Sequence, residues 1–137
     1  MTAAVLVGVF GVAGALLRFA VDSWFAHRPA AAVSRPHRRG TAAPTPQHWP
    51  WATLVVNAAG CLVIGLSVGI TGRLGLSGDL HTAVATGLAG GLTTFSSWTT
   101  ATVRLLGESR FAAAALNVAV NLVAGFAAAA AGIALVS

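Results

Sequence analysis

The sequence predicts an all-α integral membrane protein with four transmembrane helices, of which the third is broken near its middle. Three observations carry this prediction. Hydrophobic residues make up 56% of the 137 residues and charged residues only 8%, whereas a soluble domain is typically about 25% charged. Four apolar stretches are each long enough to cross a bilayer core, which takes roughly 20 helical residues. The third stretch contains a Gly-Gly pair followed by a run of hydroxyl side chains.

The length predicts a single membrane domain over residues 1–137. A lone cysteine, Cys61, excludes an intrachain disulfide and a cysteine-based metal cluster. The formal net charge is +5, and all eight basic residues are arginines that cluster between the apolar stretches. We interpret these arginines as a signal for membrane orientation rather than as a nucleic-acid surface. The expected spans are about 3–24, 51–72, 81–106 and 111–136.

The first span combines small residues with one buried charge. Gly8, Gly11 and Gly14 recur every third residue, which makes a smooth strip for close helix approach. Arg18 lies near the end of the span, where two interpretations stay open. Its guanidinium either snorkels to the lipid headgroups or places a positive charge near an anion entrance.

The loop 27–50 differs in kind, because it holds four arginines and all five prolines of the chain. Such a composition predicts a loop without a core of its own. Its histidines are scattered without metal-ligand spacing, so no metal site is expected there. Trp49 and Trp51 flank Pro50, which is typical of an aromatic anchor at a membrane interface.

The second and fourth spans each carry asparagines at membrane depth. Asn57 follows Thr53 by one helical turn, and Asn121 follows Asn117 in the same way. A buried carboxamide needs partners for two donors and an acceptor. Asn57 therefore makes an interhelical hydrogen bond or presents a donor to a permeating anion. The two asparagines of the fourth span are expected to meet the polar face of the third.

The third span holds the feature around which the chain is organised. Glycine is among the poorest helix formers, and freed backbone groups at membrane depth are tolerated only beside protein or a water-filled cavity. Gly90 and Gly91 therefore predict a helix break over residues 90–93 that lines a polar path. Phe95 and Trp98 share one helical face beyond it.

An aromatic pair at this spacing is usually core packing, but six serines and threonines lie between Thr93 and Thr100. An aromatic ring has a positive edge, and ring edges with hydroxyl donors suit an anion better than a cation. The pattern predicts an anion pathway that is formed by Asn57, Thr94, Phe95, Ser96, Ser97 and Trp98. Possible supporting residues are Arg18, Thr53, Asn117 and Asn121.

Three motifs together resemble a known family. They are Gly11-x-x-Gly14-Ala15-x-x-Arg18, Thr53-Leu54-Val55-Val56-Asn57-x-x-Gly60 and Thr86-Gly87-x-x-Gly90-Gly91-Leu92-Thr93-Thr94-Phe95-Ser96. The chain resembles the Fluc fluoride channel family, also called CrcB, over all four spans. The third motif is specific, whereas the glycines of the first span alone would not be.

The resemblance implies a dimer of four-helix subunits inserted in opposite orientations, with two narrow fluoride pores and a central structural sodium ion. Backbone carbonyls at the helix break hold that Na⁺ in the family, which maps to Gly90 and Thr93 here. The pore asparagine maps to Asn57, the first pore phenylalanine to Phe95, and the hydroxyl track to Ser96 and Ser97. The implied role is passive export of cytoplasmic fluoride across the bacterial inner membrane, which reduces fluoride toxicity.

The chain departs from the family pattern along one polar pathway. Trp98 stands where the family has a second pore phenylalanine, and Ala101 where it often has an acidic residue. Asn117 and Asn121 occupy positions where the family often has tyrosine and serine. An indole keeps a positive ring edge and adds an N–H donor, but it is bulkier than phenylalanine.

Arginine placement gives an independent prediction of topology. Six arginines lie at or near the first and third links, and only Arg73 lies on the other side. By the excess of positive charge on the cytoplasmic side, these two links are cytoplasmic and both termini face outside. A chain of fixed orientation favours a heterodimer with a homologous partner over a homodimer.

Three other classes of protein fit the sequence less well. A small multidrug exporter needs a carboxylate deep in the first span, but Asp22 lies near its end. A structural or regulatory membrane subunit without its own pore would not explain Gly90-Gly91 and the hydroxyl run. An enzyme is not predicted, because no catalytic constellation lies at membrane depth. Fluoride, membrane lipid and a second subunit are the expected partners, and nucleic acid is not.

Overall fold

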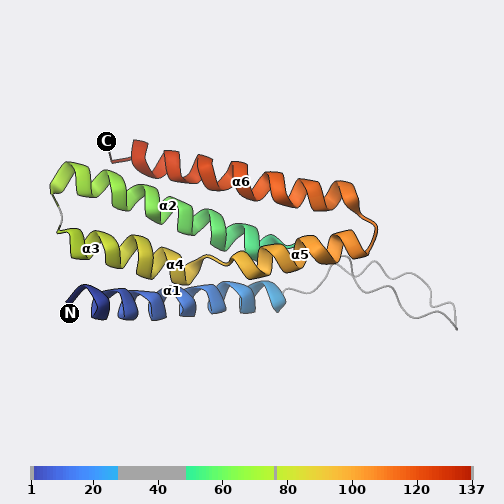
Figure 1. The fold of residues 1–137 in the computed structure, drawn as a ribbon, viewed down its shortest axis with the longest axis horizontal. Coiled ribbons are helices and arrows are strands. Elements are labelled where there is room, and N and C mark those ends of the chain that lie inside the picture. The colour runs from blue at the N-terminus through green and yellow to red at the C-terminus, as the bar shows by residue number, and fades with distance from the viewer. Residues whose placement is uncertain (1, 28–48, 76, 137) are drawn as a thin grey trace, which may run out of the picture.

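The computed structural model describes residues 2–27, 49–75 and 77–136, and these residues form helices without any strand. The long helices run side by side as an elongated bundle (Figure 1). The elements are α1 (Thr2–Ala26), α2 (Trp51–Leu74), α3 (Gly78–Thr82), the π-helix η1 (Ala83–Leu88), α4 (Ala89–Leu92), α5 (Phe95–Gly107) and α6 (Phe111–Ala134).

Three helices, α1, α2 and α6, are long and apolar enough to cross a membrane. They match the spans expected near residues 3–24, 51–72 and 111–136 to within two residues at each end. Between α2 and α6 the chain runs along the bundle as α3, η1 and α4 in direct succession and then as α5. The chain is therefore a helical membrane protein.

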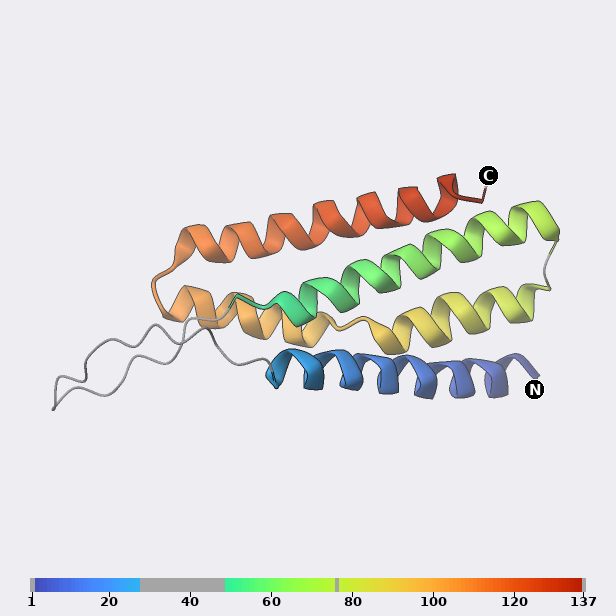
Figure 2. The same cartoon turned by 180° about the vertical axis from the view of Figure 1, so that it is seen from behind.

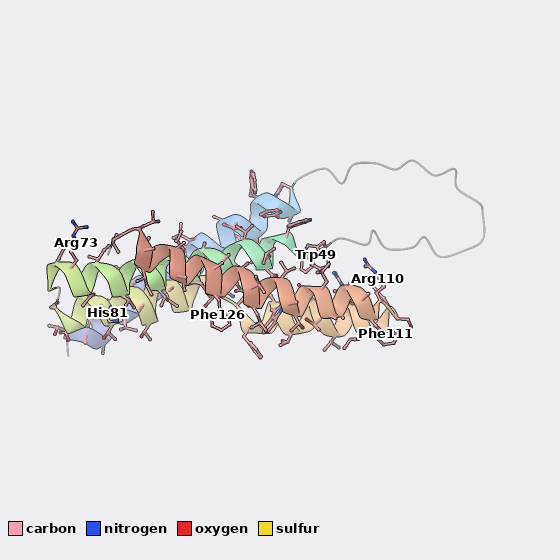
Figure 3. The ribbon with its side chains drawn as sticks, turned by 90° about the horizontal axis from the view of Figure 1, so that it is seen from above. Trp49, Arg73, His81, Arg110, Phe111 and Phe126 are labelled. Carbon is pink, nitrogen blue, oxygen red and sulfur yellow. The ribbon has the colours of Figure 1, made fainter. Side chains whose placement is uncertain are left out.

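The two ends of the bundle carry different links. Both termini and the α2–α3 link lie at one end, and the α5–α6 link lies at the other, as Figures 1 and 2 show from opposite sides. Arg73 and His81 mark the first end, while Trp49, Arg110 and Phe111 lie toward the second (Figure 3). The chain direction therefore alternates along the bundle.

The α2–α6 contact brings backbone against backbone. A Cβ added at Gly132 of α6 would lie 2.6 Å from the carbonyl oxygen of Leu62, and one added at Gly65 of α2 would collide with the carbonyl of Ala129. Only glycine fits at such positions, because any side chain would force the helices apart.

The α1 helix packs on η1 and α4 in the same way. An added Cβ would meet the Leu88 carbonyl at Gly14 and the Gly11 carbonyl at Gly91. The close approach expected at Gly11 and Gly14 is confirmed. Gly8 does not share it, since a Cβ there would meet nothing within 4 Å.

The helix is interrupted at Thr93 and Thr94, which have extended backbone (φ −75°, ψ 158° and φ −144°, ψ 114°). The expectation that Gly90 and Gly91 break the helix is wrong in its position, because both residues are helical within α4. The physical reason is packing. A Cβ at Gly91 would collide with the carbonyl of Gly11 in α1, so glycine is needed there for close contact, and its own backbone stays helical.

Polar contacts fasten the end of the bundle that holds the termini. The His81 ring Nδ1 lies 2.9 Å from the Ser67 hydroxyl and 3.2 Å from the Thr71 hydroxyl, which ties α3 to α2. The Thr2 hydroxyl donates to the Asp79 carboxylate at 3.0 Å, which ties α1 to α3. These contacts were not expected from the sequence.

Candidate functional site

The interruption at Thr94 is held by one side chain of α2. The Thr94 backbone N–H donates to Asn57 Oδ1 at 2.8 Å, and Asn57 Nδ2 donates to the Thr94 carbonyl at 3.3 Å. Asn57 thus bonds both polar backbone groups of one residue, as a neighbouring peptide would. Its second N–H donates to Asn121 Oδ1 at 3.3 Å. Both amide protons are engaged within the protein, which favours the interhelical role for this carboxamide.

The asparagines of α6 extend this network toward α5. Asn121 donates to the backbone carbonyl of Asn117 at 3.0 Å and to its side-chain oxygen at 3.2 Å. The Asn117 side chain, which is fully buried, donates to the Thr102 hydroxyl at 2.9 Å. The sequence predicted that the α6 asparagines contact the polar face of the third expected span, residues 81–106. The bond from Asn117 to Thr102 confirms this prediction.

The indole of Trp98 is fixed by the same part of α6. Its N–H donates to the Asn117 carbonyl at 3.3 Å, so this donor points at protein backbone. The Trp98 and Phe95 rings meet edge to face, with centroids 5.5 Å apart and planes at 74°. The indole N–H of Trp98 is therefore engaged by protein backbone.

These residues line a hollow of about 300 Å³ that we call the aromatic hollow. Its lining includes Asn57, Cys61, Thr94, Phe95, Trp98 and Asn121. Phe95 is 72% exposed, so this hollow opens toward the outside of the bundle.

A second hollow of about 420 Å³ lies at the end of the bundle that carries the α5–α6 link. We call it the hydroxyl hollow, because Thr53, Ser96, Ser97 and Thr100 line it together with Trp49 and Arg104. Glu108 accepts from Arg110 at 3.3 Å and pairs with Arg104 at 3.8 Å. Arg104 is the one charged side chain among the lining residues described for this hollow, and its guanidinium is the group that Glu108 pairs with.

Thr94 joins the two hollows. Its backbone bonds Asn57 in the aromatic hollow, while its hydroxyl donates to Ser97 Oγ at 3.1 Å and lies 3.3 Å from Ser96 Oγ. The same oxygen accepts from the Ser97 backbone N–H at 3.2 Å and so caps α5. Thr94 is 5% exposed, so the contact between the hollows is buried.

The structure brings most of the residues named from the sequence to these two hollows and leaves the others apart. Arg18 lies half-buried on α1 and is not among the lining residues described for either hollow. Residues 28–48 lie outside the described residues, so the expected basic loop is not placed.

Sequence reasoning overlooked Arg104 and Thr100 as lining residues, as well as the hydroxyl of Thr102 as a partner for Asn117. A helical-wheel signal was available, since Arg104 follows Thr100 and Thr100 follows Ser96 at intervals of four residues. The cap that Thr94 provides was also missed, although a threonine before a helical run is a usual N-cap.

Taken together, these features define a small helical membrane protein with two partly polar hollows beside one helix interruption. The family model "CrcB-like protein, Camphor Resistance (CrcB)" matches residues 5–133. The chain belongs to this family.

Curated relatives match nearly the whole chain. A protein of Renibacterium salmoninarum named "Fluoride-specific ion channel FluC" is 44% identical over 131 residues, which is 96% of each chain. Its counterpart in Pseudomonas putida is 37% identical over 91% of this chain and 89% of its own length. In Symbiobacterium thermophilum, "Fluoride-specific ion channel FluC 1" is 34% identical over 96% and 94%.

Proposed function

We propose that this chain is a subunit of a fluoride-selective ion channel that lets cytoplasmic fluoride leave passively and so lowers fluoride toxicity. The observation that carries the proposal is the buried Thr94, whose backbone bonds Asn57 of the aromatic hollow and whose hydroxyl bonds Ser97 of the hydroxyl hollow. The curated relatives are named as fluoride-specific channels over nearly the full length of this chain. The protein is a channel rather than an enzyme in this proposal.

The side chains suit a small, strongly hydrated anion. Hydroxyl donors of Ser96 and Ser97 can replace part of the water shell in the hydroxyl hollow. The positive ring edges of Phe95 and Trp98 can do the same in the aromatic hollow. No acidic side chain lines either hollow among the described residues, so the path carries no fixed negative charge.

We propose that α3, η1, α4 and α5 together form the third of four membrane spans in one domain over residues 1–137, broken near its middle at Thr93 and Thr94. The open side of the aromatic hollow, where Phe95 is 72% exposed, favours cover by a second subunit of opposite orientation. Two such subunits would enclose paths that each subunit leaves open alone.

A structural sodium ion would suit the backbone at this break. Na⁺ takes oxygen ligands, which unwound backbone supplies without a charged side chain. Gly90 is exposed, and a Cβ built there would meet nothing within 4 Å, so its backbone is accessible to an ion. We propose that the carbonyl groups of Gly90 and Thr93 hold this ion together with the same groups of the second subunit.

Fluoride efflux from liposomes tests the proposed function. Liposomes that contain the purified chain, alone or mixed with a homologous chain of opposite orientation, should release loaded fluoride faster than protein-free liposomes. Chloride-loaded liposomes are the control for selectivity. An absence of fluoride release in both mixtures would leave the structural-subunit alternative, and release coupled to a proton gradient would favour an exporter.

Orientation can be tested with two matched serine-to-cysteine variants in a Cys61→Ala background. Ser109→Cys lies on the α5–α6 link and Ser77→Cys on the α2–α3 link, and both positions are exposed. We expect an impermeant thiol reagent to label only Ser77→Cys in intact cells, because the arginine bias favours a cytoplasmic α5–α6 link. Equal labelling of both variants would mean dual orientation and would favour a homodimer over the proposed heterodimer.

A further inference from the structure

We propose that Asn57 acts as a surrogate peptide that keeps the helix interrupted at Thr94, and that it thereby positions the Gly90 carbonyl for the cation. This role deepens the proposed function, since it rests on the sodium site proposed above. It assigns Asn57 to the shape of the backbone rather than to direct contact with the anion.

The first step is the exchange of one backbone hydrogen bond. In a continuous α-helix the Thr94 N–H would donate to the carbonyl of Gly90, four residues earlier. In this structure it donates to Asn57 Oδ1 at 2.8 Å instead. The regular pattern ends one residue before, where the Thr93 N–H donates to the Ala89 carbonyl at 2.9 Å. The exchange therefore relieves the Gly90 carbonyl of its helical donor.

The second step is the reciprocal bond, which removes the usual cost of a break at membrane depth. Unwound backbone leaves N–H and C=O groups that must find partners within the protein. Asn57 satisfies both groups of Thr94, because its Nδ2 donates to the Thr94 carbonyl at 3.3 Å. No other common neutral side chain except glutamine offers an acceptor and two donors in this planar form.

The third step is that the clamp itself is held in place. Asn57 Nδ2 also donates to Asn121 Oδ1, and Asn121 donates to the backbone carbonyl of Asn117 at 3.0 Å. The carboxamide of Asn57 is therefore fixed by α6 as well as by its own helix. A removal of Asn57 would let the Thr94 N–H return to Gly90 and would restore the helix.

The test compares sodium-dependent stability with fluoride flux in the same purified samples. The thermal unfolding midpoint is measured in sodium chloride and in N-methyl-D-glucamine chloride, because an ion that binds only the folded state raises the midpoint. The wild-type chain should show a higher midpoint in sodium. Asn57→Leu keeps the number and branching of the side-chain heavy atoms but removes both bonds to Thr94, and its sodium affinity should fall at least about tenfold, which would erase most of the shift.

A second variant keeps the test decisive if Asn57→Leu fails to fold. Asn57→Gln keeps a carboxamide, with an acceptor for the Thr94 N–H and donors for the Thr94 carbonyl, so it should retain the sodium-dependent shift. Ser67→Ala is the control, because it removes a polar contact between α2 and His81 and involves neither Asn57 nor Thr94. A merely structural role would lower the midpoints in both salts and leave their difference unchanged.

The outcomes separate this inference from the proposed channel. A full sodium-dependent shift in Asn57→Leu, or its loss in Asn57→Gln, would overturn the positioning role. Fluoride efflux by the wild-type chain without any sodium-dependent shift would also overturn it and leave the channel intact. A shift that depends on Asn57 in a chain that never releases fluoride would support the clamp and contradict the channel.

Discussion

Replacing Phe95 with leucine is expected to reduce fluoride efflux about fivefold while the protein stays folded. Leucine keeps an apolar side chain but removes the positive ring edge, and aromatic electrostatic contacts of roughly 1 kcal/mol or more correspond to such a factor. The fold should tolerate the change, because Phe95 is 72% exposed and contacts the Trp98 ring at its edge. The measurement is the initial efflux rate from liposomes at matched protein density.

Phe126→Leu is the matched control for this variant. Phe126 lies on α6, is 76% exposed and is not among the residues that line the aromatic hollow. It lies near the middle of the bundle's length (Figure 3). If both leucine variants release fluoride at the wild-type rate, the Phe95 ring has no part in the pathway.

Replacing Gly65 with valine is expected to destabilise the bundle by at least about 3 kcal/mol, which is the upper range for overpacked positions. A Cβ at Gly65 would collide with the backbone of Ala129, and a backbone atom cannot move aside as a flexible side chain can. The variant should lose most of its folded, monodisperse fraction after extraction. The thermal unfolding midpoint of the remaining protein measures the effect.

Gly72→Val controls for the helix propensity of valine within the same helix. Gly72 is exposed, and a Cβ there would meet nothing within 4 Å. The Gly72→Val midpoint should stay near the wild-type value. Equal midpoints for the two valine variants would show that the close α2–α6 contact at Gly65 does not limit stability.

The sequence predicts helix positions well where hydrophobic length alone decides them. The ends of α1, α2 and α6 follow from apolar runs bounded by polar or proline-rich links. The asparagine positions also predict a contact, since buried carboxamides need partners, and Asn57 and Asn121 do bond each other. Hydrophobic length and the need of buried carboxamides for hydrogen-bond partners therefore leave few alternative arrangements for these helices.

The position of the helix interruption could not be predicted from local propensity. Gly90 and Gly91 are the weakest helix formers nearby, yet both are helical, and the extended residues are Thr93 and Thr94. Tertiary contacts decide this, because Gly91 fits against α1 and Asn57 takes the hydrogen bond of the Thr94 N–H. Both partners are distant in sequence, so no local pattern indicates them.

The direction in which the Trp98 indole N–H points likewise depends on a partner from another helix. Composition suggested that the indole N–H adds a donor to the anion pathway. The structure directs this N–H to the Asn117 carbonyl at 3.3 Å. The hydroxyl hollow was also beyond the sequence, because Trp49 and Arg104 lie far apart in the chain and meet only through the bundle.

The pairing of α2 with α6 has a consequence for biosynthesis. The α2 helix emerges from the ribosome second, but the helix that packs on Gly65 and supplies Asn121 emerges last. During translation α2 is therefore made before α6, and until then the carboxamide of Asn57 lacks its partner Asn121. Membrane quality-control proteases should thus degrade nascent chains most readily when translation halts before α6 is made.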